Sequence, residues 1–600
     1  MNTSAAGTVG DQVQNLTVRV AIVADSSDAA LLQELGEDGT GRGPIVHEKN
    51  LLAAVAERER AGDVRWVWAD TGGIYPALLR AGARAERCHD VALTEGLLLG
   101  RDGRLGESTA LAAAWARLRG LPAPAGTGAA SRVPAGRGGP AQAALFDPPD
   151  PVFPDARAAL GALVAVHTDQ LRRIAADEQP GRFGLLAAAE SAGGLAAAEM
   201  GFYGLPWRAD VHTGLLTEML GPRPGPGLRP ARLADLAGRI SAAFGGRPVN
   251  PDSPAQLLRA FAADGIQVTS TRSSVLRTIE HPAAPLLLEY KELARLYVAY
   301  GWSWLGEWVT QGRFRPEYVV GGVVSGRWAS RGGGALQIPR VLRRAVVADP
   351  GWVLVVADAA QLEPRVLAAL AGDGAFAAAA GTGDLYAALA GAFGGDRAKA
   401  KVALLSAMYG GAGGEAGQLL AVLRRRFPLA AQYVEAAARA GEEGRVVRSR
   451  LGRACPPPSE AWRDLTAVPD VPGEGQGRAG QTLRARGRFT RNFVVQASAA
   501  DWAIVLIATL RQRLASLPTL RQRLASLPPP TAGQAGWQEQ AQLVFFQHDE
   551  VIVHCPRAEA DAVAGAVAES AREAGRLLFG GTPVRFPITT AVVECYGDAK

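Results

Sequence analysis

Residues 352–365, with the sequence WVLVVADAAQLEPR, decide the fold of the second half of the chain. An unbroken run of apolar, strand-forming residues leads to Asp358, and a helix-like pattern follows it. Residues 543–555, LVFFQHDEVIVHC, likewise place a His-Asp-Glu step between two short apolar runs. Such runs are typical of strands buried on both faces. The two segments therefore predict a sheet that presents Asp358 at one strand end and further acids at the tip of a hairpin.

Each acid has a plainer interpretation on its own. A lone Asp at a strand end commonly caps the next helix, and an Asp-Glu turn commonly forms a solvated hairpin tip. Taken together, Asp358 and Asp549 on neighbouring strand ends could bridge two magnesium ions about 3.5 to 4 Å apart. One ion would lower the pKa of an attacking hydroxyl, and the other would neutralise charge on departing phosphates. The pair therefore indicates a nucleotidyl transferase.

A basic stripe lies between the two acids in the chain. Arg397, Lys401, Leu405 and Tyr409 follow one another at four-residue spacing, which puts them on one face of a predicted helix. A solvated cationic face is the alternative interpretation. The aromatic residue at the far end, followed by two glycines, favours a site that holds phosphates at its start and a base and sugar toward its end.

Composition sets broad limits on the protein. With 600 residues, of which 48% are hydrophobic, the chain is long enough for three or more domains with ample cores. A net charge of +6 fits a polyanionic partner but is too small to establish one. The four cysteines, Cys88, Cys455, Cys555 and Cys595, show no paired spacing, so neither a zinc site nor a disulfide framework is expected. We recognise no leader peptide and no membrane span, which predicts a soluble, cytoplasmic protein.

The apolar spacing divides the chain into segments. Alternating strand and helix patterns predict an α/β domain over residues 1–120, and the Pro-, Ala- and Gly-rich residues 121–156 predict a linker. Helical spacing dominates residues 157–320. Strand-like residues 319–328, VVGGVVSGRW, and the two acidic segments, with helices between them, predict one sheet interrupted by a helical module.

One decapeptide occurs twice. Residues 509–518 and 519–528 both read TLRQRLASLP, a period too short for a solenoid. We interpret the repeat as a recent duplication in a surface connection without a catalytic role, where proline limits how far a helix continues.

Six motifs, in order, resemble those of family A DNA polymerases. DAAQLEPR at 358–365 resembles motif A, the stripe from Arg397 to Gly410 resembles motif B on the fingers helix, and QHDE at 547–550 resembles motif C. The further matches are Gly326-Arg327 with LQIP at 336–339, Gly452-Arg453, and Arg488, Asn492, Gln496 and Asp501. With the helical segment that contains EYKEL at 289–293, the resemblance covers residues 185–600.

The resemblance implies an α+β multidomain fold, a right-hand polymerase behind a small ribonuclease H-like, exonuclease-type domain at residues 1–120. The palm, an antiparallel sheet, would comprise residues 321–372 and 490–600, the fingers 373–489 and the thumb region 157–320. The implied reaction is template-directed addition of dNTPs to a primer 3′-hydroxyl with two Mg²⁺ ions, for which Mn²⁺ could substitute, in DNA repair or gap filling. The partners would be primer-template DNA and dNTPs, and the protein a monomer associated with a bacterial nucleoid and with no membrane.

The resemblance also implies a role for each matching residue. The metal ligands would be Asp358, Asp549 and the backbone carbonyl of Ala359, with Glu550 as a supporting acid and Lys401 as an acid toward pyrophosphate. The dNTP would contact Arg397, Lys401, Leu405, Tyr409, Gln361, Glu363 and Tyr386, and Glu363 with Tyr409 would crowd the sugar 2′ position and exclude ribonucleotides. The DNA would contact Arg327, Gln337, Arg488, Asn492, Gln496 and His548, three of which, Arg327, Gln496 and His548, would touch the minor-groove edge of the primer end.

The chain also departs from the family pattern. Ala359-Ala360 replaces Tyr-Ser after the acid, Leu405 replaces Phe or Tyr, Pro364 follows Glu363, and Tyr386 replaces a histidine. None of these changes removes a predicted metal ligand or triphosphate cation. We therefore expect an active polymerase with altered sugar selectivity, speed or fidelity.

The first domain lacks the acids that 3′-5′ exonuclease chemistry needs. That chemistry uses a D-x-E pair and two further acids around two metals. No D-x-E occurs before residue 160, and Gly73 stands where an acidic ligand would, although Asp90 lies in a matching place. We expect an inactive scaffold or DNA-guiding domain. The alternatives are a non-catalytic DNA-binding paralogue and a polymerase that retains some 3′-5′ exonuclease activity.

Overall fold

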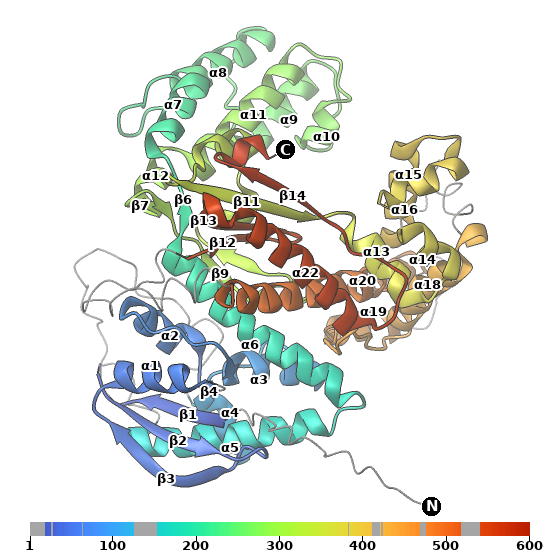
Figure 1. The fold of residues 1–600 in the computed structure, drawn as a ribbon. Helices are drawn as coiled ribbons and strands as arrows, with labels where there is room; N and C mark the ends of the chain where they lie inside the picture. The colour runs from blue at the N-terminus through green and yellow to red at the C-terminus, as the bar shows by residue number, and fades with distance from the viewer. Residues whose placement is uncertain are drawn as a thin grey trace, which may run out of the picture.

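A computed structural model describes residues 18–25, 28–62, 64–124, 153–381, 383–410, 421, 424–467, 476–517 and 540–599. A central sheet with helices packed on it separates three lobes (Figure 1). In that view an N-terminal α/β domain lies below the sheet, a helical lobe lies above it, and a second helical lobe lies to its right. The mixed α+β architecture is the one predicted from the sequence.

The N-terminal domain is built on a five-stranded sheet in the order β3-β2-β1-β4-β5. Strands β1 (Val18–Ala24), β4 (Val64–Trp68) and β5 (Cys88–Asp90) run parallel, while β2 (Ala30–Leu35) and β3 (Gly41–Glu48) extend the sheet antiparallel to β1. Strands β1 and β4, each followed along the chain by a helix, α1 (Leu51–Ala61) or α2 (Thr71–Arg80), fit the alternation of strand and helix patterns predicted for this domain. Strand β3 was not predicted because its exposed sequence, GRGPIVHE, lacks apolar alternation.

Helix α5 (Ala156–Ala175) belongs to the core of this domain, although it comes from the segment predicted as thumb. Its Leu160, Leu163 and Val166 are buried with Ala21 and Val67 of the sheet. The domain boundaries predicted from the sequence remain predictions. Residues 125–152 of the predicted linker lie outside the described residues.

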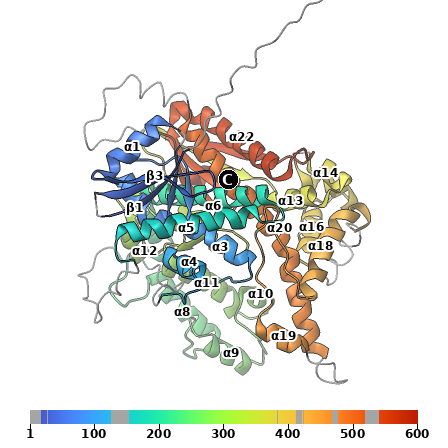
Figure 2. The same cartoon turned by 90° about the horizontal axis from the view of Figure 1, so that it is seen from below.

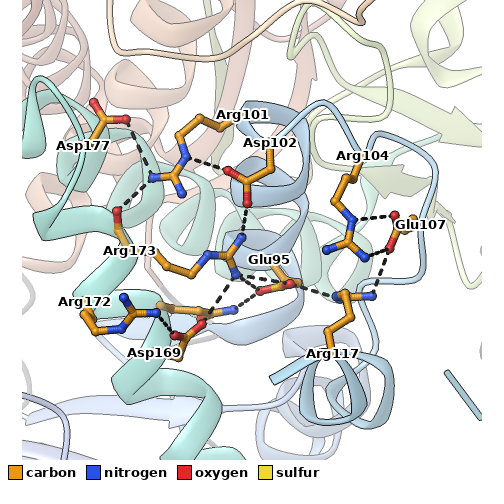
Figure 3. A network of polar contacts seen from close by, with 11 residues as sticks. Glu95, Arg101, Asp102, Arg104, Glu107, Arg117, Asp169, Arg172, Arg173 and Asp177 are labelled. Atoms are coloured by element: carbon orange, nitrogen blue, oxygen red, sulfur yellow. Dashed lines mark hydrogen bonds and ion pairs between the residues drawn. The ribbon is translucent and has the colours of Figure 1, made fainter. Parts of the chain in front are cut away.

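A polar network ties α5 to helices α3 (Val91–Arg101) and α4 (Leu111–Leu118), as Figure 3 shows. The buried Glu95 carboxylate accepts from Arg117 at 3.0 Å and from Arg173 at 3.3 Å. Arg173 also reaches Asp102 at 2.7 Å. The network therefore joins the helices on both sides of the linker.

Helix α6 (Pro180–Tyr203) lies between the N-terminal domain and the rest of the protein. Two adjacent glycines allow the close approach on both sides. A Cβ on Gly193 would lie 2.4 Å from Ile504 Cδ1, and one on Gly194 would lie 3.1 Å from Leu93 Cδ1. The glycine pair therefore lets one helix pack against two domains.

A buried ion-pair cluster closes the same interface. Glu199 of α6 accepts from Arg511 at 2.7 Å and from Arg84 at 2.9 Å, and the Tyr75 hydroxyl donates to it at 2.6 Å. Arg511 belongs to the first copy of the decapeptide and is 3% exposed. The prediction of a surface connection is therefore wrong for residues 509–515 of this copy, because they form the end of helix α20 (Gln476–Ala515), where Arg511 is buried. The second copy lies outside the described residues.

The upper lobe, which we call the thumb lobe, consists of helices with one shared core. They are α7 (Ala209–Leu220), α8 (Ala231–Ala243), α9 (Pro254–Ala263), α10 (Ser273–Leu276) and α11 (Ala283–Tyr300). Helix α12 (Trp302–Trp308) and a small sheet of β6 (Leu205–Pro206), β8 (Arg313–Phe314) and β7 (Val309–Thr310) connect this lobe to the central sheet.

The central sheet, which we call the palm sheet, has the order β12-β13-β11-β14, and all three pairings are antiparallel. Its strands are β11 (Trp352–Ala359), β12 (Gln542–Gln547), β13 (Glu550–Pro556) and β14 (Ile588–Val593). Helix α22 (Ala560–Phe579) and helix α20 share a core with the palm sheet. The strands predicted around the two acidic segments are confirmed.

The strand predicted at 319–328 is wrong. Only short pieces flank it, β9 (Glu317–Val319) and β10 (Ala329–Arg331), which pair in a separate two-stranded sheet. Gly321 and Gly326 adopt positive φ angles of 59° and 83°, so the intervening backbone turns instead of extending.

The right-hand lobe, which we call the fingers lobe, comprises α13 (Leu362–Ala371), α14 (Gly374–Ala380), α15 (Leu385–Ala390), α16 (Arg397–Tyr409), α18 (Pro428–Glu442) and α19 (Glu460–Ala467). Helix α20 runs beside α18 and α19 (Figure 2). By length and composition α20 is the one candidate membrane span among the described residues, but 83% of its most apolar window is buried inside the protein. Helices of this kind occur in the cores of folded domains.

Candidate active site

The two predicted acids lie beside each other at one end of the palm sheet. Asp358 of β11 is directly opposite Glu550 of β13, the residue after Asp549. The Ala359 amide donates to the Asp549 carbonyl at 2.9 Å. Cα atoms of directly opposed antiparallel residues are about 4.5 to 5.5 Å apart. Strand pairing therefore brings together two acidic motifs that are far apart in the sequence.

The hairpin that carries Asp549 has a constrained tip. The turn residues are His548 and Asp549, and Glu550 already belongs to β13, so the predicted hairpin presents Asp549 at its tip and Glu550 at the start of the next strand. His548 has φ of 59°, and the Asp549 amide donates to the Gln547 carbonyl at 2.7 Å. A non-glycine residue with positive φ is uncommon and is held in place by its surroundings. Partial burial and the nearby Arg327 lower the pKa of His548, which keeps its ring neutral.

Glu550 contacts two residues, Arg343 and Tyr596, that the sequence did not identify. The carboxylate is buried, and an Arg343 guanidinium nitrogen lies 4.0 Å from it. That guanidinium also lies 4.4 Å from the ring centroid of Tyr596, which is 1% exposed. The chain therefore uses its last helical turn, η6 (Tyr596–Asp598), to cover this acid.

The donor set at the sheet end fits a hard divalent cation. Asp358 and Asp549 supply carboxylate oxygens, and Ala359 lies beside them with its backbone carbonyl. Oxygen donors of this kind suit Mg²⁺, which takes one or two carboxylates and keeps several waters. Within the described ranges, no group of three or more His, Cys, Asp or Glu side chains is arranged so that it could hold a metal ion.

Glu363 connects the palm to the fingers. Its carboxylate accepts from the Arg327 guanidinium and from the Tyr409 hydroxyl. Burial and the bond to Glu363 raise the pKa of Tyr409, so its hydroxyl stays protonated. Gln496 of α20 also interacts with Tyr409. The structure thus gathers four predicted residues, two assigned to sugar selection and two to the primer end.

The basic stripe forms one helix, as predicted, but its two cations differ. Arg397 is the first residue of α16, and its Nε donates to Asp384 at 2.7 Å. The guanidinium lies 5.5 Å from the ring centroid of Tyr386, which is buried. Lys401 is exposed, and Leu405 is half-buried. Asp384 was missed because its only sequence feature is that of a helix cap.

Arg365 anchors the fingers to the end of β11. The side chain is fully buried and donates to the carbonyls of Ala360 at 3.0 Å, Gly383 at 2.6 Å and Arg585 at 3.0 Å. Burial lowers its pKa. One guanidinium therefore binds carbonyls from three separate segments. Arg365 is part of the DAAQLEPR motif, but the sequence analysis assigned it no role.

The other residues assigned to DNA lie on helix α20 and at the base of the thumb lobe. Arg488 of α20 is exposed, and its Cγ lies within 3.3 Å of where a Cβ on Gly410 would stand. Asn492 is partly buried one turn further along. Gln337 is exposed at the base of the thumb lobe and accepts from Arg295 at 3.4 Å.

The acid retained in the N-terminal domain acts as a helix cap. Asp90 is 1% exposed and accepts from the backbone amides of Leu93 and Thr71, both at 2.8 Å. Burial and the nearby Asp70 raise its pKa to about 6. Both carboxylate oxygens are therefore committed to backbone amides. This arrangement is consistent with the predicted loss of exonuclease chemistry.

A cavity of about 550 Å³ lies at the other end of β11. Trp352 and Gly351 line it, six and seven residues before Asp358, a separation of about 20 Å along a strand. The cavity is therefore separate from the acidic end of the palm sheet.

A palm sheet with paired acids, connected through Glu363 and Tyr409 to a fingers helix with a cationic start, is the arrangement of right-hand polymerases. A comparison with protein families bears this out, since the model of "DNA polymerase family A" matches residues 229–592. The match covers more than half of the chain, and the protein belongs to DNA polymerase family A.

Curated relatives and a solved structure agree with this membership. DNA polymerase I of Chloroflexus aurantiacus is 27% identical over 381 residues, which are 56% of this chain and 36% of the relative. The thermostable DNA polymerase I of Thermus aquaticus is 24% identical over 388 residues, 58% of this chain and 41% of the relative. The matches thus span well under half the length of these relatives. The POL domain of Pol1 from M. smegmatis, solved in complex with DNA primer-template and dNTP, shares the fold of this chain with a TM-score of 0.66. The two sequences are 20% identical, and the match covers 97% of this chain and 96% of that one.

Proposed function

We propose that the protein is a template-directed DNA polymerase that adds dNTPs to a primer 3′-hydroxyl, in short repair or gap-filling synthesis. The observation that carries this proposal is the strand register that sets Asp549 beside Asp358. Membership of family A supports it, as does the match to a structure solved with primer-template and dNTP.

The palm acids would hold two divalent cations. Asp358 and Asp549 would be the ligands, with the Ala359 carbonyl beside them and Glu550 fixed behind by Arg343. Two such ions, when bound, activate an attacking hydroxyl and screen the charge on departing phosphates. The protein's own contribution is to orient these oxygens. The antiparallel pairing and the constrained turn at His548 both serve that purpose.

The fingers would bind the nucleotide, and palm residues would contact its sugar and the minor-groove edge of the base pair. Arg397 and Lys401 would contact the triphosphate, and Lys401 could donate a proton toward pyrophosphate. Glu363, held by Arg327 and Tyr409, would occupy the space that a 2′-hydroxyl needs. His548, Arg327 and Gln496 would meet minor-groove acceptors that are common to all base pairs.

A primer-extension assay tests this proposal. Replacing Asp549 with Ala is expected to abolish extension while primer-template binding, measured by fluorescence anisotropy, is retained. Asp561→Ala, which removes an exposed acid at the start of α22, is the matched control and should extend like the parent. Extension by Asp549→Ala at the parental rate would refute the metal assignment.

The same assay distinguishes the alternatives. A non-catalytic DNA-binding paralogue would bind the primer-template without extending it. Shortening of single strands in the absence of dNTPs, dependent on metal, would show residual exonuclease activity. The capping role of Asp90 supports the expectation that the parent does not shorten them.

A further inference from the structure

The cation that would meet the triphosphate is already engaged by an acid. Arg397 donates through Nε to Asp384 at 2.7 Å, and its guanidinium lies over the ring of Tyr386. Carboxylates and phosphates present similar oxygen acceptors to a guanidinium. The ion pair is only half-buried, with side-chain exposures of 55% for Arg397 and 40% for Asp384, so a ligand can reach it from solvent.

The Asp384 carboxylate is held in place from three sides. Its Oδ1 caps α15 by accepting from the Tyr386 and Ala387 amides at 3.0 and 3.1 Å. Gln361 Nε2 donates to the same oxygen at 2.7 Å. Partial burial would raise the pKa of Asp384, but the hydrogen bonds from Arg397 and Gln361 outweigh it and lower the pKa to about 2. The carboxylate is therefore ionised and leaves Oδ2 directed at Arg397.

Gln361 links this acid to the catalytic strand. The residue follows β11 in a left-handed conformation with φ of 57°, and its Oε1 accepts from the Leu385 amide at 2.9 Å. Arg365 holds the same two segments together through the carbonyls of Ala360 and Gly383. A continuous set of hydrogen bonds thus runs from the end of β11 to the first residue of α16.

We propose that Asp384 is a positioning residue that holds Arg397 in the nucleotide-free fingers and competes with the incoming triphosphate for it. The competition lowers the affinity for every dNTP by a common factor. The inference rests on the proposed polymerase function.

The test measures dNTP binding without chemistry. The parent, Asp384→Asn and Asp396→Asn are each bound to a primer-template that ends in a dideoxynucleotide, and the Kd for the next complementary dNTP is measured by titration. Asp396 is a matched control because it caps α16 in the same way, accepting from the Ala398 and Lys399 amides at 2.8 and 3.0 Å. Asparagine retains the capping role in both variants.

Asp384→Asn is expected to bind dNTP about two- to fivefold more tightly than the parent, the range that an exposed ion pair is worth. Asp396→Asn should bind like the parent, and Asp384→Glu should restore the parental Kd. Melting temperatures of the two asparagine variants within about 2 °C of the parent would show that capping survives.

The outcomes separate the inference from the function on which it rests. Equal tightening in Asp384→Asn and Asp396→Asn would overturn the inference, since it would reflect overall charge. Weaker or unchanged binding in Asp384→Asn would overturn it as well, because Asp384 would then support the site instead of competing for it. A parent that binds no dNTP and extends no primer would overturn the proposed function itself, and the competition with it.

Discussion

Replacing Arg511 with Met is expected to destabilise the protein by several kilocalories per mole. The guanidinium is 3% exposed and donates to both oxygens of Glu199, to the carbonyls of Ala85 and Glu86 and to the Tyr75 hydroxyl. Methionine keeps much of the apolar stem but leaves these acceptors without that donor. Breaking a buried ion pair by removing one partner costs about 3 to 5 kcal/mol.

The structure places the expected loss near the lower end of that range. Glu199 keeps its bonds from Arg84, at 2.9 and 3.2 Å, so its charge is not left alone. We therefore expect a loss of about 3 kcal/mol. Guanidinium unfolding, followed by tryptophan fluorescence, measures it as a shift of the midpoint at an unchanged slope.

Arg513→Met is the matched control, since Arg513 lies two residues away in the same helix end. Its ion pair with Glu569, at 3.3 Å, is partly exposed and should be worth less than about 1 kcal/mol. Equal losses in the two variants would refute the assignment of Arg511 to a buried domain junction.

The same cluster has a pH dependence with a defined sign. Although burial opposes it, the guanidinium groups of Arg511 and Arg84 lower the pKa of Glu199 from 4.5 to about 2. A group whose pKa is lower in the folded state stabilises fully above its unfolded value. This contribution is therefore present above about pH 4.5 and is lost as the pH falls toward 2. In Arg511→Met, where Arg84 alone pairs with Glu199, this contribution should be smaller and its loss should be complete at a higher pH.

Three further predictions concern packing, protonation and sugar choice. Gly193→Ala should lower the unfolding free energy by about 1 to 3 kcal/mol because its Cβ would meet Ile504. Gly181→Ala on the same helix has open space around it and should cost nothing, so equal denaturation midpoints for the two variants would contradict this prediction. Burial lowers the pKa of His89 from 6.5 to about 4, so the unfolding free energy should fall as the pH drops from about 6.5 to about 4. His89→Phe should therefore show a smaller difference than the parent between its urea midpoints at pH 7 and pH 5. Glu363→Ala should reduce discrimination against ribonucleotides about 10- to 100-fold in single-nucleotide incorporation, since two charge-assisted hydrogen bonds order that carboxylate. An unchanged ratio of dNTP to ribonucleotide incorporation would show that Glu363 does not select the sugar.

Local sequence patterns were sufficient for the elements that carry the site. Strands β11, β12 and β13 each contain a continuous apolar run, and the residues spaced by four from Arg397 to Tyr409 do form one helix. Patterns failed where glycines turned the backbone, as at residues 319–328, and where polar sequence formed a strand, as in β3. They also misassigned the first decapeptide, because its Arg511 is buried only through acceptors supplied by other segments.

The sequence alone determined the family, the palm strands and the acids at their ends, because these depend on residue types and on periodicity within short segments. Only the tertiary structure decided that Asp549 lies beside Asp358, that Asp384 holds Arg397 and that α6 joins two domains through paired glycines. The physical reason is that strand register, ion pairing and close helix packing are set by distances between residues remote in the chain. A local pattern contains no information about those distances.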